Sequence, residues 1–167
     1  MKSIFYLLPV VTGVLLSGCA SGRNGMALET VGPQPPQSAV ISPANGTLVV
    51  YSAYEAGAEF NSRNEFGQSH SDYRLLSGDG KLLQKVHNDT GTMLQNPAAV
   101  QLPPGKYQVL AQANGYGCVT VPVIIEPQQT TIIHLEGGYA WPDEGAFNQT
   151  NAVRLPDGLV VGWKAGS

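Results

Sequence analysis

The three histidines of this chain share one spacing relative to an acidic residue. A carboxylate follows each of them two positions later, in the pairs His70 with Asp72, His87 with Asp89, and His134 with Glu136. Side chains two positions apart on a β-strand lie on one face, so each pair could offer an imidazole and a carboxylate to a zinc or copper ion. Such a site needs three or four converging ligands, and no two histidines are closely spaced. We therefore expect solvated strand faces and turn residues here, with no metal and no other cofactor.

Two aromatic residues in one expected loop form the second candidate site. Tyr139 and Trp141 follow two glycines, and Tyr54 or Tyr116 could join them. Aromatic faces suit the binding of sugar rings, because they bury area at low entropy cost and carry a negative quadrupole. The alternative is that Trp141 covers an open end of the fold. Large aromatic side chains are more often buried than exposed, which favours the covering role.

No catalytic signature occurs in the chain. It lacks a Gly-x-Ser-x-Gly elbow, a phosphate loop, a dinucleotide fingerprint and a His-Glu-x-x-His pair. The 9 basic and 12 acidic residues give a net charge of −3, and the basic residues form no run or patch. A nucleic-acid partner is therefore not expected. The sequence predicts a protein that is not an enzyme.

The N-terminal residues have the pattern of an export signal. Lys2 precedes an apolar run of 13 residues, Ile4 to Leu16, which is too short to span a bilayer comfortably. The run ends in Leu16-Ser17-Gly18-Cys19, which resembles the lipobox of bacterial lipoproteins. The resemblance implies that residues 1–18 are removed as a signal peptide. It also implies that the thiol of Cys19 becomes a diacylglycerol thioether and that the new amine is acylated.

Two or three acyl chains on one residue would hold the protein firmly on a membrane. Each buried methylene contributes roughly 0.8 kcal/mol, and a single chain binds only marginally. Ala20 and Ser21 follow the cysteine. In the lipoprotein pattern, an aspartate just after the cysteine retains the protein at the inner membrane. Its absence implies a cell-envelope location at the outer membrane, on its periplasmic or surface face.

Cys118 is the second cysteine of the chain. With Cys19 used by the anchor, Cys118 is expected to have no partner for a disulfide within the chain. No histidine lies near it in sequence. We therefore expect a small buried residue in or beside a strand rather than a reactive thiol.

Residues 19–45 are expected to form a flexible tether between the lipid and the folded part. The run 32–38 is rich in proline and glutamine, has no apolar period and favours polyproline II. If residues 20–44 were extended at about 3.1 Å each, they would reach roughly 80 Å. Such a tether would lift the domain well off the membrane.

From Gly46 onward the chain shows short β-branched and aromatic segments between turn signals, and no convincing helical period. Strands are expected at 47–54, 72–76, 81–86, 99–102, 107–113, 119–125 and 131–136. Period-two alternation places Val109 and Val121 in the core of neighbouring strands. Pro122 lacks a donor, which favours an edge strand or a bulge. The prediction is an all-β fold: a small antiparallel β-sandwich over 46–136, with residues 137–167 as a loop and hairpin packed on it.

A second resemblance covers about 35 residues of this region. The segments Leu102 to Val109, Asn114-Gly115-Tyr116 and Val123 to Thr131 are similar to the closing half of carboxypeptidase regulatory-like and PEGA-type domains. Residues 137–167 lie outside it. The resemblance implies a transthyretin-like or immunoglobulin-like sandwich without catalysis, used as a spacer or interaction module on extracytoplasmic proteins.

Together these observations predict a lipid-anchored envelope protein whose sandwich is a structural or interaction module, with an envelope protein or a glycan as partner. The alternative is a lipoprotein that binds peptidoglycan or another polysaccharide through Tyr139 and Trp141. A metal-binding envelope protein is the third hypothesis.

Overall fold

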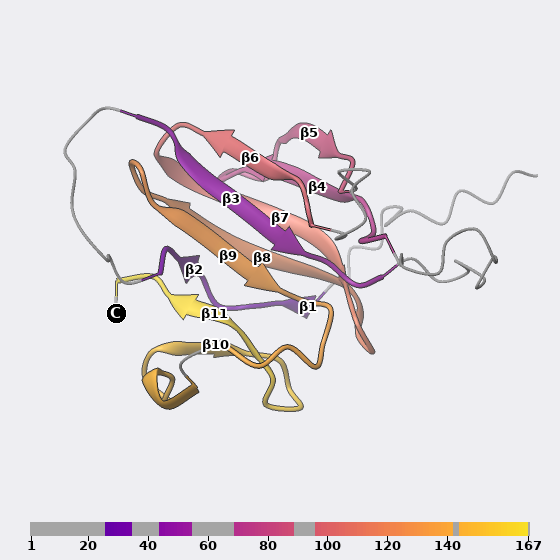
Figure 1. Ribbon diagram of the computed structural model, residues 1–167. Helices are drawn as coiled ribbons and strands as arrows, with labels where there is room; N and C mark the ends of the chain where they lie inside the picture. Colours follow the sequence, from indigo (N-terminus) through magenta and orange to yellow (C-terminus); the bar gives the residue numbers. More distant parts are fainter. Residues whose placement is uncertain (1–25, 35–43, 55–68, 89–95, 142–143, 167) are drawn as a thin grey trace, which may run out of the picture.

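The computed structural model describes residues 26–34, 44–54, 69–88, 96–141 and 144–166 (Figure 1). The expected signal peptide, its cleavage motif and Cys19 lie outside these residues. The strands are β1 (Met26–Ala27), β2 (Val31–Gly32), β3 (Gly46–Tyr51), β4 (Tyr73–Ser77), β5 (Leu82–Val86), β6 (Ala99–Leu102), β7 (Gly105–Ala113), β8 (Gly117–Ile125), β9 (Thr130–His134), β10 (Ala152–Arg154) and β11 (Val160–Lys164). One 3-10 turn, η1 (Glu144–Ala146), is the single helical element in the described ranges, and none of their elements is an apolar helix long enough to cross a membrane. The expected all-β class is confirmed.

The strands form two sheets that face each other. The larger sheet has the order β10-β11-β2-β8-β7-β4-β5, with β1 also pairing β8, and the smaller sheet has the order β6-β3-β9 (Figure 1). Alternate residues of β7 and β8 point into the space between the sheets. Val109 lies directly opposite Val121 in the β7–β8 ladder, and both are fully buried, as the period-two alternation predicted. Leu48, Val50 and Ile133 of the smaller sheet close the core from the other side.

The strand pairing is mixed rather than antiparallel throughout. β3 runs parallel to β9 over five residue pairs, and β1 and β2 run parallel to β8. Parallel partners need a long connection between them, which the many residues between β3 and β9 provide. The strand segments were recognisable locally, but their partners are distant in sequence.

The expected tether is wrong for residues 26–34. Met26 and Ala27 pair with Val119 and Thr120, and Val31 pairs with Val123 in the middle of the larger sheet. Val31 is fully buried. Strands of two residues are too short to show an apolar period, so backbone pairing with β8 places this segment without a sequence signal. Of the expected tether, residues 20–25 and 35–43 lie outside the described residues.

Pro122 lies in an interior strand and not at an edge or a bulge. Thr120 accepts a hydrogen bond from the Leu28 amide on the side of β1 and β2, and Pro122 faces the same side because it is two residues further on. The ladder on this side is interrupted between Ala27 and Val31. The missing donor of Pro122 therefore lies opposite this break, where no strand bond is lost.

The C-terminal hairpin forms at the expected place. β10 and β11 pair with each other, and Trp163 of β11 pairs with Gly32 of β2, so the hairpin extends the larger sheet. β11 also contacts β9 of the smaller sheet. The hairpin and the N-terminal strands therefore stabilise each other.

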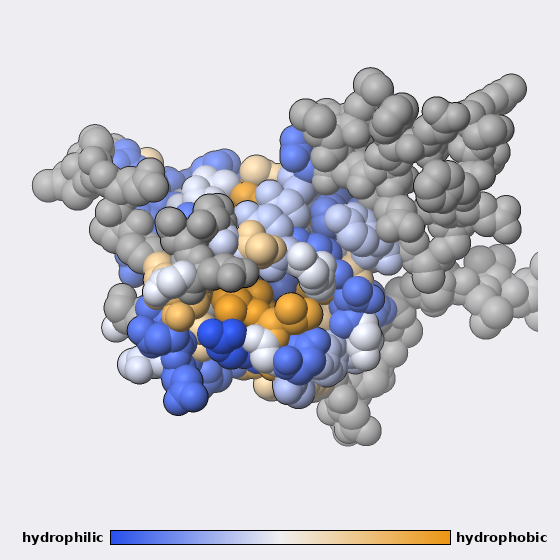
Figure 2. Space-filling view, turned by 60° about the horizontal axis from the view of Figure 1, so that its bottom comes forward, coloured by the Kyte–Doolittle hydropathy of each residue, from blue (hydrophilic) through white to orange (hydrophobic). Residues whose placement is uncertain are grey.

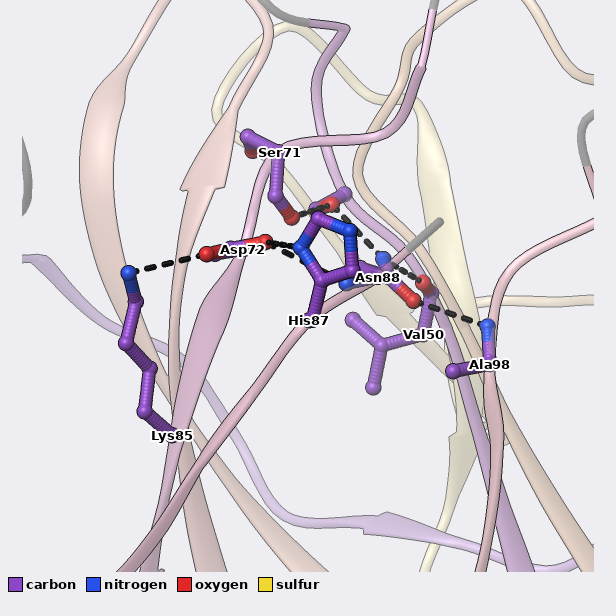
Figure 3. Close-up of polar contacts among 8 residues, drawn as sticks. Val50, Ser71, Asp72, Lys85, His87, Asn88 and Ala98 are labelled. Carbon is purple, nitrogen blue, oxygen red and sulfur yellow. Dashed lines mark hydrogen bonds and ion pairs between the residues drawn. The ribbon is translucent and has the colours of Figure 1, made fainter. Parts of the chain in front are cut away.

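The buried side chain of Asn88 joins the two sheets just after β5. Its amide nitrogen donates to the carbonyl of Val50, 2.8 Å away in β3, and its side-chain oxygen accepts the Ala98 amide at 3.0 Å (Figure 3). Beside it, Asp72 contacts Lys85 at 2.8 Å and His87 at 2.9 Å (Figure 3). These bonds fasten the edge of the larger sheet to the smaller one.

Candidate functional site

Eight rings form a continuous series of contacts across one end and one face of the sandwich. We call this set the aromatic row; in order of contact it comprises Tyr54, His70, Tyr51, His134, Tyr139, Trp141, Phe147 and Trp163. Its members come from strands β3, β9 and β11 and from the loops around residues 54, 70, 139 and 147. The row contains both residues that the sequence singled out, Tyr139 and Trp141.

His134 lies at the centre of the row. Its imidazole stacks on Tyr51 with centroids 4.3 Å apart and on Tyr139 with centroids 3.7 Å apart. The edge contact with Trp141, at 4.7 Å, closes a third side. Rings on three sides leave little room for a substrate at this imidazole. The contact with His134 also holds the ring of Tyr139 in place.

Glu136 supplies a buried carboxylate beside the row. Its Oε1 lies 2.7 Å from Nδ1 of His134, whereas its Oε2 is buried and has no hydrogen-bond partner among the described residues. Burial, then the charges of Tyr139 and Glu136, raise the pKa of Tyr51 above its ordinary value. Burial and the charge of Glu136 likewise raise the pKa of Tyr54. Both phenols are therefore held in their neutral form.

A cleft of about 290 Å³ opens where the row meets the C-terminal hairpin. The described residues that line it are Tyr139, Trp141, Phe147, Arg154, Gly158, Leu159 and Val160. On the face that carries β10 and β11, hydrophobic side chains gather in a patch among hydrophilic ones (Figure 2). The volume is near the lower limit for a small-molecule site.

The two candidate aromatic residues differ in exposure. Tyr139 is 41% exposed, whereas Trp141 is 6% exposed and makes a long hydrogen bond of 3.4 Å from Nε1 to the Val160 carbonyl. Trp141 is thus buried among the rings of His134, Tyr139 and Phe147, as the covering role that the sequence favoured requires. A flat platform of two open rings is absent from this loop, and Tyr139 is its exposed ring.

Among the described residues, one of the expected histidine–acid pairs is in contact. His134 contacts Glu136, although β9 ends at His134 and Glu136 lies in the bend that follows. His87 instead contacts Asp72, while Asp89 lies outside the described residues. His70 donates from Nδ1 to the Ser52 carbonyl at 2.6 Å. Within the described ranges, no three histidine, cysteine, aspartate or glutamate side chains converge where they could hold a metal ion.

Cys118 lies in a strand as expected, but the expectation that it has no disulfide partner is wrong. This residue, partly buried in β8 next to the β7–β8 turn, is disulfide-bonded. The chain contains one other cysteine, Cys19, which lies outside the described residues. The sequence argument assigned that sulfur to a lipid and for this reason excluded a disulfide within the chain.

Most of the aromatic row has no signal in the sequence. Tyr51, His70 and His134 are far apart along the chain, and nothing local marks them as neighbours. β3 and β9 both end at this side of the smaller sheet because they are parallel, with Tyr51 in register with His134. The pairing of distant strands therefore assembles the row.

Comparison with known proteins assigns no family. No family model, no curated protein and no solved structure matches this chain.

Proposed function

We propose that this protein is a lipid-anchored component of a bacterial cell envelope whose β-sandwich is a non-catalytic interaction module. The contacts of the three histidines support the proposal that the module is non-catalytic. His70 is bonded to a backbone carbonyl, and His134 is enclosed by three rings. His87 is exposed and is paired with Asp72.

The sandwich offers an exposed surface for a partner at the aromatic row. Tyr139 and Leu159 border the cleft, and both are more than a third exposed. Mixed aromatic and aliphatic surface of this kind is enriched at interaction sites. The resemblance of residues 102–131 to carboxypeptidase regulatory-like domains also supports a role as spacer or interaction module.

The anchor is proposed from Leu16-Ser17-Gly18-Cys19 and the apolar run before it. The sulfur of Cys19 can carry a lipid thioether or a disulfide, but not both. The lipidated form therefore excludes a Cys19–Cys118 disulfide, and it differs in this respect from the structure, in which Cys118 is disulfide-bonded. This exclusion turns the state of Cys118 into a test of the anchor.

The test is mass spectrometry of the protein isolated from envelopes in detergent without reductant, with metabolic labelling by palmitate. We expect a mature chain that begins at Cys19, carries diacylglycerol and acyl groups, and incorporates the label. The Cys19→Ala variant should remain uncleaved and unlabelled, and Cys118→Ala, the matched control, should be labelled like the wild type. Isolation of a chain with a Cys19–Cys118 disulfide and no lipid would reject the anchor.

A saccharide is the second candidate ligand, favoured by the cleft beside Tyr139. Because Trp141 is buried, one exposed ring remains to stack on a sugar. Peptidoglycan and soluble polysaccharides should retain the wild-type protein and lose the Tyr139→Ala variant if this function holds. Equal retention of both proteins, or of neither, would reject it.

A further inference from the structure

We propose that the end of the sandwich that exposes Tyr54, Tyr139 and Leu159 rests on the lipid surface. This inference depends on the proposed anchor at Cys19. It adds an orientation of the domain and a binding surface for the bilayer.

The N-terminal strand shows where the chain from the anchor reaches the domain. Met26 pairs with Val119, and the Leu28 amide donates to the Thr120 carbonyl at 2.8 Å. Val119 lies close to the start of β8, just after the β7–β8 turn at residues 114–116. We call this side of the sandwich the anchor end, because the chain from Cys19 arrives here.

Three exposed apolar residues lie at the same anchor end. The Ala53 amide donates to the Gln112 carbonyl, the Asn114 amide to the Leu135 carbonyl, and the Asp157 amide to the Tyr116 hydroxyl, at 2.8–3.0 Å. These bonds hold the segments around residues 54, 139 and 159 beside the β7–β8 turn. Tyr54 is 42% exposed and Leu159 is 37% exposed, which gives this end two tyrosine rings and a leucine.

The length of the connection restricts how the domain can be oriented. Six residues, 20–25, separate Cys19 from Met26. Seven Cα–Cα steps therefore lead from Cys19 to Met26, and at about 3.5 Å each they reach roughly 25 Å. β7 and β8 each have nine residues. At about 3.3 Å per step, the first and last residues of these strands lie roughly 26 Å apart. In an inverted domain the anchor end would lie at least one strand length from the lipid, and the connection would have to be fully extended. The short connection therefore favours the orientation in which the anchor end faces the lipid.

The chemistry of the anchor end suits a bilayer surface. Tyrosine has an apolar ring and a polar hydroxyl, and it is enriched where headgroups meet acyl chains. The other exposed leucines, Leu82 and Leu83, lie on the edge strand β5 beside the β4–β5 turn at the opposite end. Of the two ends, the one with exposed rings is the one the anchor holds near lipid.

The experiment uses the full chain, lipidated in cells, purified in detergent and reconstituted into phosphatidylcholine–phosphatidylglycerol vesicles. In a Cys118→Ser background, single cysteines replace Tyr139 or Leu159 at the anchor end. Lys81→Cys and Lys106→Cys are matched exposed controls at the opposite end. Each thiol carries an environment-sensitive fluorophore, and some vesicles contain lipids with a shallow nitroxide quencher. Flotation of the vesicles is measured first, and thermal melts confirm that each variant is folded.

We expect labels at positions 139 and 159 to shift to the blue and to lose fluorescence with the quencher lipid, while labels at 81 and 106 do neither. Floating protein with equal quenching at both ends, or with none, would overturn the orientation and leave the anchor intact. Protein that fails to float would overturn both the anchor and the orientation. If soluble polysaccharide changes the fluorescence of the label at position 139 in anchored protein, while the quencher lipid does not, the anchor end faces away from the lipid and the inference is wrong.

Discussion

The imidazole of His134 lies flat on the ring of Tyr139, with centroids 3.7 Å apart and planes 7° apart. Four residues separate them, and the chain between them reverses at Gly137 and Gly138, whose φ angles are 77° and 73°. Side chains with a Cβ rarely adopt such angles, so the glycines allow the loop to fold back over β9. Tyr139 therefore has a defined place at the surface while one of its faces is covered.

Trp141 and Tyr139 should separate stability from binding. Trp141→Ala removes a buried ring and should lower the free energy of unfolding by about 3–5 kcal/mol, as large aromatic truncations do. Tyr139→Ala should cost clearly less, because its ring is 41% exposed. Chemical denaturation measures both. Equal losses in the two variants would contradict the covering role of Trp141.

Asn88→Ala should weaken the junction between the sheets. The variant leaves the Val50 carbonyl and the Ala98 amide without their partner, at a cost of about 1–3 kcal/mol in unfolding free energy. Gln101→Ala is the control, since Gln101 makes an exposed bond to Thr47 and its loss should cost about 0.5 kcal/mol or less. Urea unfolding curves compare the two variants. An unchanged midpoint for Asn88→Ala would contradict the role of Asn88 in joining the two sheets.

Tyr73→Phe should stabilise the protein. The Tyr73 hydroxyl is buried and has no hydrogen-bond partner among the described residues, so its removal should gain about 1 kcal/mol. Burial raises the pKa of Tyr73 well above its ordinary value of 10.0. As the pH rises, Tyr73 therefore ionises in the unfolded chain first, and the stability of the fold falls above the ordinary pKa of 10.0. The variant should lose less stability there.

Tyr107→Phe provides the opposite case, because the Tyr107 hydroxyl donates to the Pro103 carbonyl at 2.9 Å. It should be neutral or slightly destabilising. Melting temperatures between neutral and alkaline pH would show the contrast, and destabilisation by Tyr73→Phe at every pH would contradict the prediction.

Asp72 should contribute to acid sensitivity. Burial alone would raise its pKa, but hydrogen bonds from Lys85, His87 and the Asn88 amide together lower the pKa below the ordinary value of 3.8. A lowered folded pKa gives stability that is complete above the unfolded value and is lost as the pH falls through the folded one. Asp72→Asn should therefore flatten the fall of stability below about pH 4. An identical acid profile in the two proteins would argue against this contribution.

Val31→Ala tests whether the N-terminal segment belongs to the fold. Val31 is fully buried between β8 and β11, so truncation should cost about 2 kcal/mol. Glu29→Ala, two residues earlier, removes an exposed ion pair with Lys164 and should cost less than about 1 kcal/mol. Chemical denaturation of the full chain measures both changes. If residues 26–34 were a tether, neither variant would change the free energy of unfolding.

Local pattern was sufficient for the strands from residue 46 onward. The alternation through Val109, Val121 and their neighbours requires a half-buried strand, because side chains alternate with period two. Turn residues such as Ser77-Gly78-Asp79-Gly80 marked the hairpin between β4 and β5. Residues 26–34 carried no such signal, since a strand of two residues has no period.

By itself, the sequence determined the all-β class, the strand positions from residue 46 onward, the Val109–Val121 core and the absence of a recognised catalytic motif. These depend on residue type and short spacing alone. Tertiary structure decided which strands are parallel, where the N-terminal segment enters the larger sheet, and that Tyr51, His134 and Tyr139 form one stack. The physical reason is that these features depend on pairing between segments far apart in the chain. Such pairing is governed by the burial of the whole core, and no local spacing encodes it.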